Sequence, residues 1–304
     1  MGLPYPLTTH AKHSVTRMRL VGRARGNRHG VTDQTDARLP DPPTAATLGR
    51  ILRLLEPARR LVNPKVYGAD NLPKRGALLV GNHTLLGLLD APLLCAELWE
   101  RGVRVRVLGN HAHFKLPRWR DLLTSVGVVP GTPETADALM SRGETVLVFP
   151  GGGREVAKRK GEKYQLIWEN RMGFARLAVK HGYPIVPFAT VGAEDSLDVV
   201  LDNDSPLLAP ARRLFERVSG SPDLFPLVRG IGPTPIPRPE RQYYWFGEPI
   251  DTTDVAGTDD RAVRRIRDQT KAAIEQGIEF LIEEQRTDPQ RSVVKRLMGP
   301  ERRR

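Results

Sequence analysis

The sequence has only one cysteine, Cys95, so it cannot form an internal disulfide, which is typical of a chain that folds in a reducing compartment. Cys95 lies in an apolar stretch with helical spacing, and we interpret it as a core residue rather than a nucleophile. No apolar run is long enough to span a bilayer as a helix. The N-terminal region lacks the continuous apolar segment of a cleaved secretory signal. We therefore expect neither a membrane-spanning nor an exported protein.

Aromatic residues make up only 6% of the chain and do not alternate with basic ones, as they do where nucleic-acid bases stack. The glycine-rich segment 150–154 lacks the Gly-Lys-Ser/Thr ending of a P-loop and the spacing of a dinucleotide-binding turn. His111 and His113 have no third ligand at metal-binding spacing, so we interpret them as loop or pocket-lining residues. We expect no metal and no nucleic-acid partner. A nucleic-acid- or nucleotide-binding protein stays an alternative, because the chain is basic.

The net charge is +12, and the excess of basic residues lies in both tails and in the first half of the chain. Residues 1–44 are polar and basic and are predicted to be a disordered tail, and 287–304 a basic C-terminal tail. In residues 45–64 leucines recur at helical spacing with arginines between them. This amphipathic segment is predicted to lie on an anionic membrane surface. The alternative is a helix that packs on its own domain.

Residues 65–286 alternate between strand and helix patterns, which predicts an α/β domain. The expected strands are 77–80, 103–107, 145–149, 185–190 and 242–246, and the expected helices are 88–101, 132–143, 168–181 and 259–285. Such alternation favours a mostly parallel mixed sheet with helices on both faces. Residues 196–235 break the pattern and are predicted to form an irregular insertion that lines or covers the site.

Two strand ends carry the chemistry. His83 follows the 77–80 strand and Asp90 lies a few residues on, so a carboxylate can orient the imidazole as a general base. The 145–149 strand leads into the glycines at 151–153 and then Arg154, where backbone amides and a fixed positive charge favour an anion. These two strand ends predict one site.

Four segments in this order resemble the glycerolipid acyltransferase superfamily. His83 and Asp90 match the first family block, segments 114–117 and 125–129 the second, 149–155 the third, and 185–188 the fourth. The resemblance covers about residues 65–250. It implies a glycerol-3-phosphate acyltransferase-like fold and makes residues 65–286 the acyltransferase domain. The Pro-Gly-Gly-x-Arg-Glu form of the third block is most similar to the branch of diacylglycerol and phytyl-ester acyltransferases.

The sequence also departs from the family pattern. Six residues separate His83 from Asp90, where the family usually has four, which puts the orienting role of Asp90 in question. The usual glutamate of the third block is Gly151, and its serine is Glu155. The second block continues into Pro130 and Gly131 without the arginine that the family associates with the acceptor's phosphate. This absence indicates a neutral alcohol as acceptor.

The resemblance implies an O-acyltransferase that moves a fatty acyl chain from an acyl thioester to a lipid hydroxyl. His83 is the expected general base and Asp90 its partner. The expected substrate-binding residues are Asn82, Lys115, Gly151, Gly152, Gly153, Arg154, Glu155 and Pro187. The expected co-substrate is a thioester of coenzyme A or acyl carrier protein, with no cofactor. The expected location is cytoplasmic, peripheral on the inner face of the cell membrane. Alternatives are a lysophosphatidic acid or lysophospholipid acyltransferase in phospholipid synthesis and a lipid-binding protein without catalysis.

Overall fold

The structure is a computed structural model. It describes residues 39–74, 76–87, 89–219, 225–254 and 259–298, with the side chains of 218 and 219 excepted. The predictions for residues 1–38 and 299–304 lie outside the described residues.

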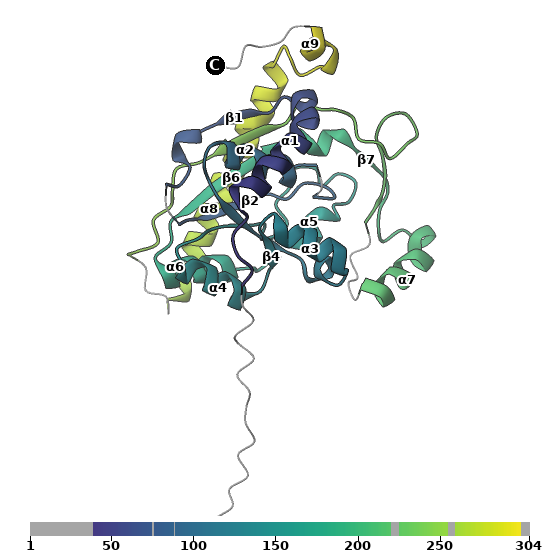
Figure 1. Ribbon diagram of the computed structural model, residues 1–304. Coiled ribbons are helices and arrows are strands. Elements are labelled where there is room, and N and C mark those ends of the chain that lie inside the picture. The colour runs from purple at the N-terminus through teal and green to yellow at the C-terminus, as the bar shows by residue number, and fades with distance from the viewer. Residues whose placement is uncertain (1–38, 75, 88, 220–224, 255–258, 299–304) are drawn as a thin grey trace, which may run out of the picture. The chain divides into compact units, whose positions relative to one another are not determined.

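A seven-stranded sheet forms the centre of the domain (Figure 1). Its order is β1-β9-β6-β2-β5-β3-β4. The strands are β1 Lys65–Tyr67, β2 Leu78–Gly81, β3 Val105–Gly109, β4 Val128–Pro130, β5 Thr145–Val148, β6 Ile185–Val191 and β9 Tyr243–Phe246. Strands β6, β2, β5, β3 and β4 run parallel, while β9 pairs antiparallel with β6 and parallel with β1. The predicted mostly parallel mixed sheet is confirmed.

Both faces of this sheet are buried under helices, as its apolar strands require. In β2 the side chains alternate: Leu78 and Val80 belong to the core on one face, and Leu79 belongs to the core on the other. The first core is completed by α4 Pro133–Ser141, α6 Gly173–His181 and α8 Asp260–Thr287, and the second by α2 Ala91–Glu100. Cys95 of α2 is buried in the second core, and burial raises the pKa of its thiol to about 12, so it is a core residue.

Helix α1, Ala45–Val62, runs unbroken through Pro57 and begins at Thr44, whose hydroxyl caps it. Its Arg59 is buried and pairs with Glu97 and Glu100 of α2. The predicted amphipathic helix therefore exists, and Arg59 on one side of it packs against α2.

The predicted tails are packed where the structure describes them. The Pro40 carbonyl accepts a hydrogen bond of 2.8 Å from Arg106. At the other end, helix α9, Val293–Met298, follows α8, and its Arg296 donates to the Leu61 carbonyl at 3.1 Å. Buried Arg106 and Arg296 thus tie both segments to the domain.

The segment after β6 is more regular than predicted. Strands β7 Asp198–Leu201 and β8 Leu227–Arg229 form a separate antiparallel pair. Between them lie η4, Pro206–Leu208, and helix α7, Ala209–Ser219. Figure 1 shows α7 at the lower right, standing clear of the sheet. Among the described residues, no helix combines the length and apolar composition that a bilayer crossing needs.

Candidate active site

The site lies at the carboxyl end of the parallel strands, the edge where open α/β sheets place their ligands. Val80 of β2 is in register with Val148 of β5 and with Pro187 of β6. His83 therefore leaves the sheet beside Phe149, which follows β5. The two rings stack with centroids 4.0 Å apart and planes at 14°. The two predicted strand ends do form one site.

Asp90 faces the imidazole from the start of α2. Its Oδ2 lies 3.8 Å from His83 Nδ1, which is longer than a hydrogen bond, and accepts from the Thr84 amide at 3.2 Å. Asp90 is fully buried. Burial by itself would raise the pKa of its carboxyl, but the neighbouring His83, the Thr84 side chain and the Ala91 amide hold that pKa below its ordinary value. The carboxylate is therefore ionised and close enough to stabilise a protonated His83 ring.

The unusual spacing between His83 and Asp90 is absorbed by a left-handed turn. Leu86 has φ 65° and Gly87 has φ 62°. The Leu86 amide donates to the Val156 carbonyl at 2.9 Å, and the Gly87 amide to the Thr84 carbonyl at 3.1 Å. The two additional residues are thus folded into the turn, and the carboxylate still reaches the ring.

Gly87 is a site residue that the sequence analysis missed. A Cβ at this position would lie 2.3 Å from His83 Cε1, so only glycine allows the turn to pass against the ring. The signal was present in the sequence, because a glycine between a histidine and its carboxylate marks a close approach. The role of this glycine could be recognised only once the turn at Leu86 and Gly87 was seen to fold back against the ring.

Asn82 and Glu155 hold the His83 loop in place and are both buried. Asn82 exchanges two hydrogen bonds with the backbone of Thr190 in β6, at 3.0 and 2.8 Å. Glu155 accepts from the amides of His83 and Ile167, both at 2.9 Å, one on each carboxylate oxygen. Burial raises the pKa of Glu155, although Lys158 and the two amides oppose it. In this structure both side chains contact the protein backbone rather than a substrate cavity.

The glycine segment begins the short helix α5, Gly152–Val156. Gly151 is packed so closely that a Cβ would lie 2.0 Å from the Glu155 carboxyl carbon, and Gly152 has φ 51°. Arg154 pairs with Glu162 at 2.5 Å, so its charge already has a carboxylate partner. Arg171, which the sequence analysis missed, donates to the Pro150 carbonyl at 2.8 Å and fixes the start of this turn.

The structure places Lys115 and Pro187 on different elements. Lys115 is exposed at the end of η2, His111–Phe114. Pro187 is buried inside β6, where its carbonyl accepts from the Gly247 amide at 2.8 Å. Pro187 is therefore part of the sheet. His113 lies in η2, where its Nδ1 accepts from Trp119 at 3.4 Å.

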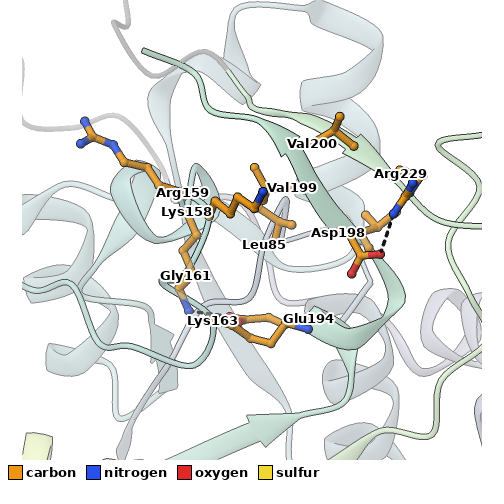
Figure 2. A pocket seen from close by; sticks show the side chains of 12 residues that line it. Leu85, Lys158, Arg159, Gly161, Lys163, Glu194, Asp198, Val199, Val200 and Arg229 are labelled. Atoms are coloured by element: carbon orange, nitrogen blue, oxygen red, sulfur yellow. Dashed lines mark hydrogen bonds and ion pairs between the residues drawn. The ribbon is translucent and has the colours of Figure 1, made fainter. Parts of the chain in front are cut away.

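A cavity of about 430 Å³ adjoins the His83 loop through Leu85 (Figure 2). The segment from Lys158 to Lys163 supplies one wall, with Lys160 among its residues, and β7 supplies the other. Lys158 is buried and pairs with Glu194, which is also buried. The side chains of Leu85, Val199 and Val200 add apolar surface. A cavity with cationic and aliphatic walls suits an amphiphilic ligand.

Comparison with known proteins agrees with this geometry. The family model described as Acyltransferase matches residues 63–191, which contain His83, Asp90 and the glycine segment. Residues 63–191 therefore match an acyltransferase domain, and the chain is similar to the glycerolipid acyltransferase superfamily. The predicted resemblance, and with it the assignment as an acyltransferase, is confirmed at the level of the family.

Two curated relatives are similar to this chain. Phytyl ester synthase 2, chloroplastic, of Arabidopsis thaliana is 32% identical over 253 residues, which are 77% of this chain and 36% of the relative. The DGAT1/2-independent enzyme synthesizing storage lipids of Gallus gallus is 27% identical over 186 residues, 61% of this chain and 52% of the relative. The chain thus spans about a third to a half of these relatives. A solved structure, the 1-acyl-sn-glycerophosphate (LPA) acyltransferase PlsC from Thermotoga maritima, covers 75% of this chain and 78% of its own, with TM-score 0.47 and 17% identity.

Proposed function

We propose that the protein is an O-acyltransferase that moves a fatty acyl chain from an acyl thioester to a lipid hydroxyl. One observation carries this proposal: His83 leaves the sheet edge with Nδ1 directed at a buried, ionised Asp90. Because the carboxylate faces Nδ1, the ring presents Nε2 to a substrate. His83 takes the proton of the acceptor hydroxyl as that oxygen attacks the thioester carbonyl, and Asp90 stabilises the imidazolium.

The thiol of the donor is the leaving group, so the reaction needs neither a covalent enzyme intermediate nor a cofactor. The donor is a thioester of coenzyme A or of acyl carrier protein. In the proposal, backbone amides of the segment Gly151–Gly153 stabilise the oxyanion, as preorganised donors do in acyl transfer. Arg154 binds an anion of the donor or acceptor after exchanging its pairing with Glu162. The neighbouring cavity receives part of one amphiphilic substrate.

The proposed acceptor is a neutral alcohol, such as diacylglycerol or a long-chain alcohol. The segment 127–132 carries no arginine for an acceptor phosphate, and Arg154 already has a carboxylate partner. A phosphate left without a cation in a partly desolvated site is costly to bind. The names of the two relatives, a phytyl ester synthase and a storage-lipid enzyme, support this acceptor class. Lysophosphatidic acid is the alternative acceptor.

The proposed location is the cytoplasmic face of the cell membrane, where the protein is peripheral. A lipid acceptor of this class lies in a bilayer, and the chain has a net charge of +12, which favours an anionic leaflet.

The decisive experiment measures free thiol with the purified protein, long-chain acyl-coenzyme A or acyl carrier protein, and a panel of alcohols, lysolipids and diacylglycerol. We expect thiol release that depends on an acceptor and is lost in His83→Ala. A protein that binds lipid vesicles but releases no thiol with any donor and acceptor would be a lipid-binding protein without catalysis. Binding to nucleic acid without thiol release would favour the remaining class.

A further inference from the structure

Helix α3, Pro117–Ser125, presents an exposed apolar ridge. None of its residues is buried. Leu116, Trp119 and Leu122 are spaced three apart, so they lie on one side of the helix, and they are exposed by 64%, 37% and 47%. Trp119 donates to His113 Nδ1 at 3.4 Å. The ridge therefore contacts η2, the turn that follows β3.

A second exposed apolar group lies on the segment between β7 and β8. Leu207 of η4 is exposed by 79% and Leu214 of α7 by 63%, although both are large aliphatic side chains. Strand β7, which precedes them in the chain, lines the cavity to which Leu85 of the His83 loop also contributes. Exposed leucines on a helix that stands clear of its own domain are typical of a binding surface.

The topology places both groups at the edge that carries His83. Helix α3 follows the carboxyl end of β3, and the β7–β8 segment follows the carboxyl end of β6. Because β3, β6 and β2 point the same way, these segments emerge from the same edge as the His83 loop. In Figure 1 both α3 and α7 lie toward the lower right of the sheet. The docking face is defined here as Leu116, Trp119, Leu122, Leu207 and Leu214.

Exposed basic residues accompany the docking face. Arg118 and Arg120 are on α3, and Arg213 and Arg217 are on α7. Cations interleaved with leucine and tryptophan match the headgroup region of an anionic bilayer, where the rings and aliphatic chains enter and the cations meet lipid phosphates.

We infer that the docking face seats the protein on an anionic lipid bilayer, so that the acceptor enters the His83 site directly from the membrane. The inference rests on the proposed function, because a lipid acceptor explains why such a face surrounds the catalytic edge. In this inference the docking face, rather than α1, is the principal membrane-binding surface, since α1 is fixed to α2 by buried Arg59.

The test measures co-sedimentation of the full chain with phosphatidylglycerol–phosphatidylcholine vesicles that contain neither donor nor acceptor. The double variant Arg213→Glu/Arg217→Glu is compared with the matched control Arg50→Glu/Arg53→Glu on α1, whose arginines are also exposed. The α7 variant is expected to weaken binding by about tenfold or more, because each basic residue near an anionic leaflet contributes several-fold. The control is expected to change binding far less.

A second readout uses Trp119 directly. The chain has four tryptophans; Trp168 is buried, while Trp99 and Trp245 pack against the cores. Vesicles with brominated acyl chains are expected to quench the Trp119 emission, and Trp119→Phe is expected to remove the quenched component. The double variant Leu116→Ser/Leu122→Ser is expected to bind vesicles more weakly. It should stay folded, since both side chains are exposed.

Three outcomes overturn the inference: no vesicle binding, a larger loss in the α1 control than in the α7 variant, or unquenched Trp119 on bound protein. Loss of self-association in the α7 variant, without loss of lipid binding, would identify the face as a contact between copies of the chain. The two proposals fail separately. Thiol release with a detergent-dispersed acceptor but no vesicle binding refutes docking alone, and vesicle binding without thiol release refutes catalysis alone.

Discussion

Replacement of Asp90 by asparagine tests the core of the site, because it removes a charge and preserves the shape of the side chain. The carboxylate is buried and its Oδ2 lies 3.8 Å from His83 Nδ1. At that distance two unit charges interact by about 4 kcal/mol when the effective dielectric constant is about 20. This interaction exists only when His83 has taken a proton, which is the charge that develops in the transition state.

We therefore expect Asp90→Asn to lower kcat by up to about a thousandfold, since 1.36 kcal/mol corresponds to about tenfold in rate. His83→Ala removes the base itself and should be at least as damaging, within the range of about a hundredfold to ten-thousandfold for general bases. In the asparagine variant the acidic limb of the pH–rate profile should also move to lower pH. The ring is harder to protonate once the neighbouring negative charge is gone.

The assay is thiol release from acyl-coenzyme A at saturating acceptor over a range of pH. A matched control is Asp137→Asn, because Asp137 lies 2.8 Å from His181 in a second His–Asp pair, formed by α4 and α6. The control should leave the rate unchanged. Full activity of Asp90→Asn with an unshifted pH profile would show that Asp90 does not assist His83.

Asp90 also makes a prediction for stability in acid. Its pKa in the folded protein lies below the ordinary value of 3.8. The stability that it contributes is therefore fully present above about pH 4 and is lost as the pH falls through the lower folded-state value. Asp90→Asn should flatten the acid side of the plot of Tm against pH, and a plot that keeps the wild-type slope would assign acid unfolding to other carboxylates.

Three further substitutions separate the roles of the surrounding residues. Gly87→Ala should lower kcat by about a hundredfold or more, because a Cβ at this position would lie 2.3 Å from the His83 ring. Its control is Gly102→Ala, where φ is also positive, at 79°, but no atom lies within 4 Å of the added Cβ. This control variant should keep its activity. Glu155→Gln places a side-chain N–H group against one of the two backbone amides that Glu155 accepts from. It should therefore lower the free energy of unfolding, measured with denaturant, by about 1–3 kcal/mol. An unchanged denaturation midpoint would contradict the observed pairing. In the third experiment, diacylglycerol and lysophosphatidic acid compete on the same vesicles. The product of diacylglycerol should carry most of the labelled acyl chain, both with the wild type and with Arg154→Ala. If the wild type instead prefers lysophosphatidic acid and Arg154→Ala loses that preference, Arg154 binds the acceptor phosphate.

The glycine segment and its arginine show where sequence reasoning stopped. The residue types predicted an anion site, yet the packed Gly151 and the pairing of Arg154 with Glu162 are tertiary facts. The same holds for Glu155. As a charged residue in the motif it was predicted to bind substrate, but its two carboxylate oxygens accept from backbone amides of distant segments. No local pattern reveals which partner a charged side chain will find across the fold.

The sequence by itself determined the α/β class, the strands around Leu78, Val146 and Ile185, and the placement of His83 at a strand end. These features follow from the spacing of apolar residues and from the turn residues between them, which act within a few positions along the chain. The tertiary structure alone decided that Asp90 reaches His83, because the left-handed turn at Leu86 and Gly87 folds the intervening residues back. It also decided that α1 is tied to α2 and that α3 and α7 expose their leucines at the catalytic edge, since burial depends on contacts between segments far apart in the chain.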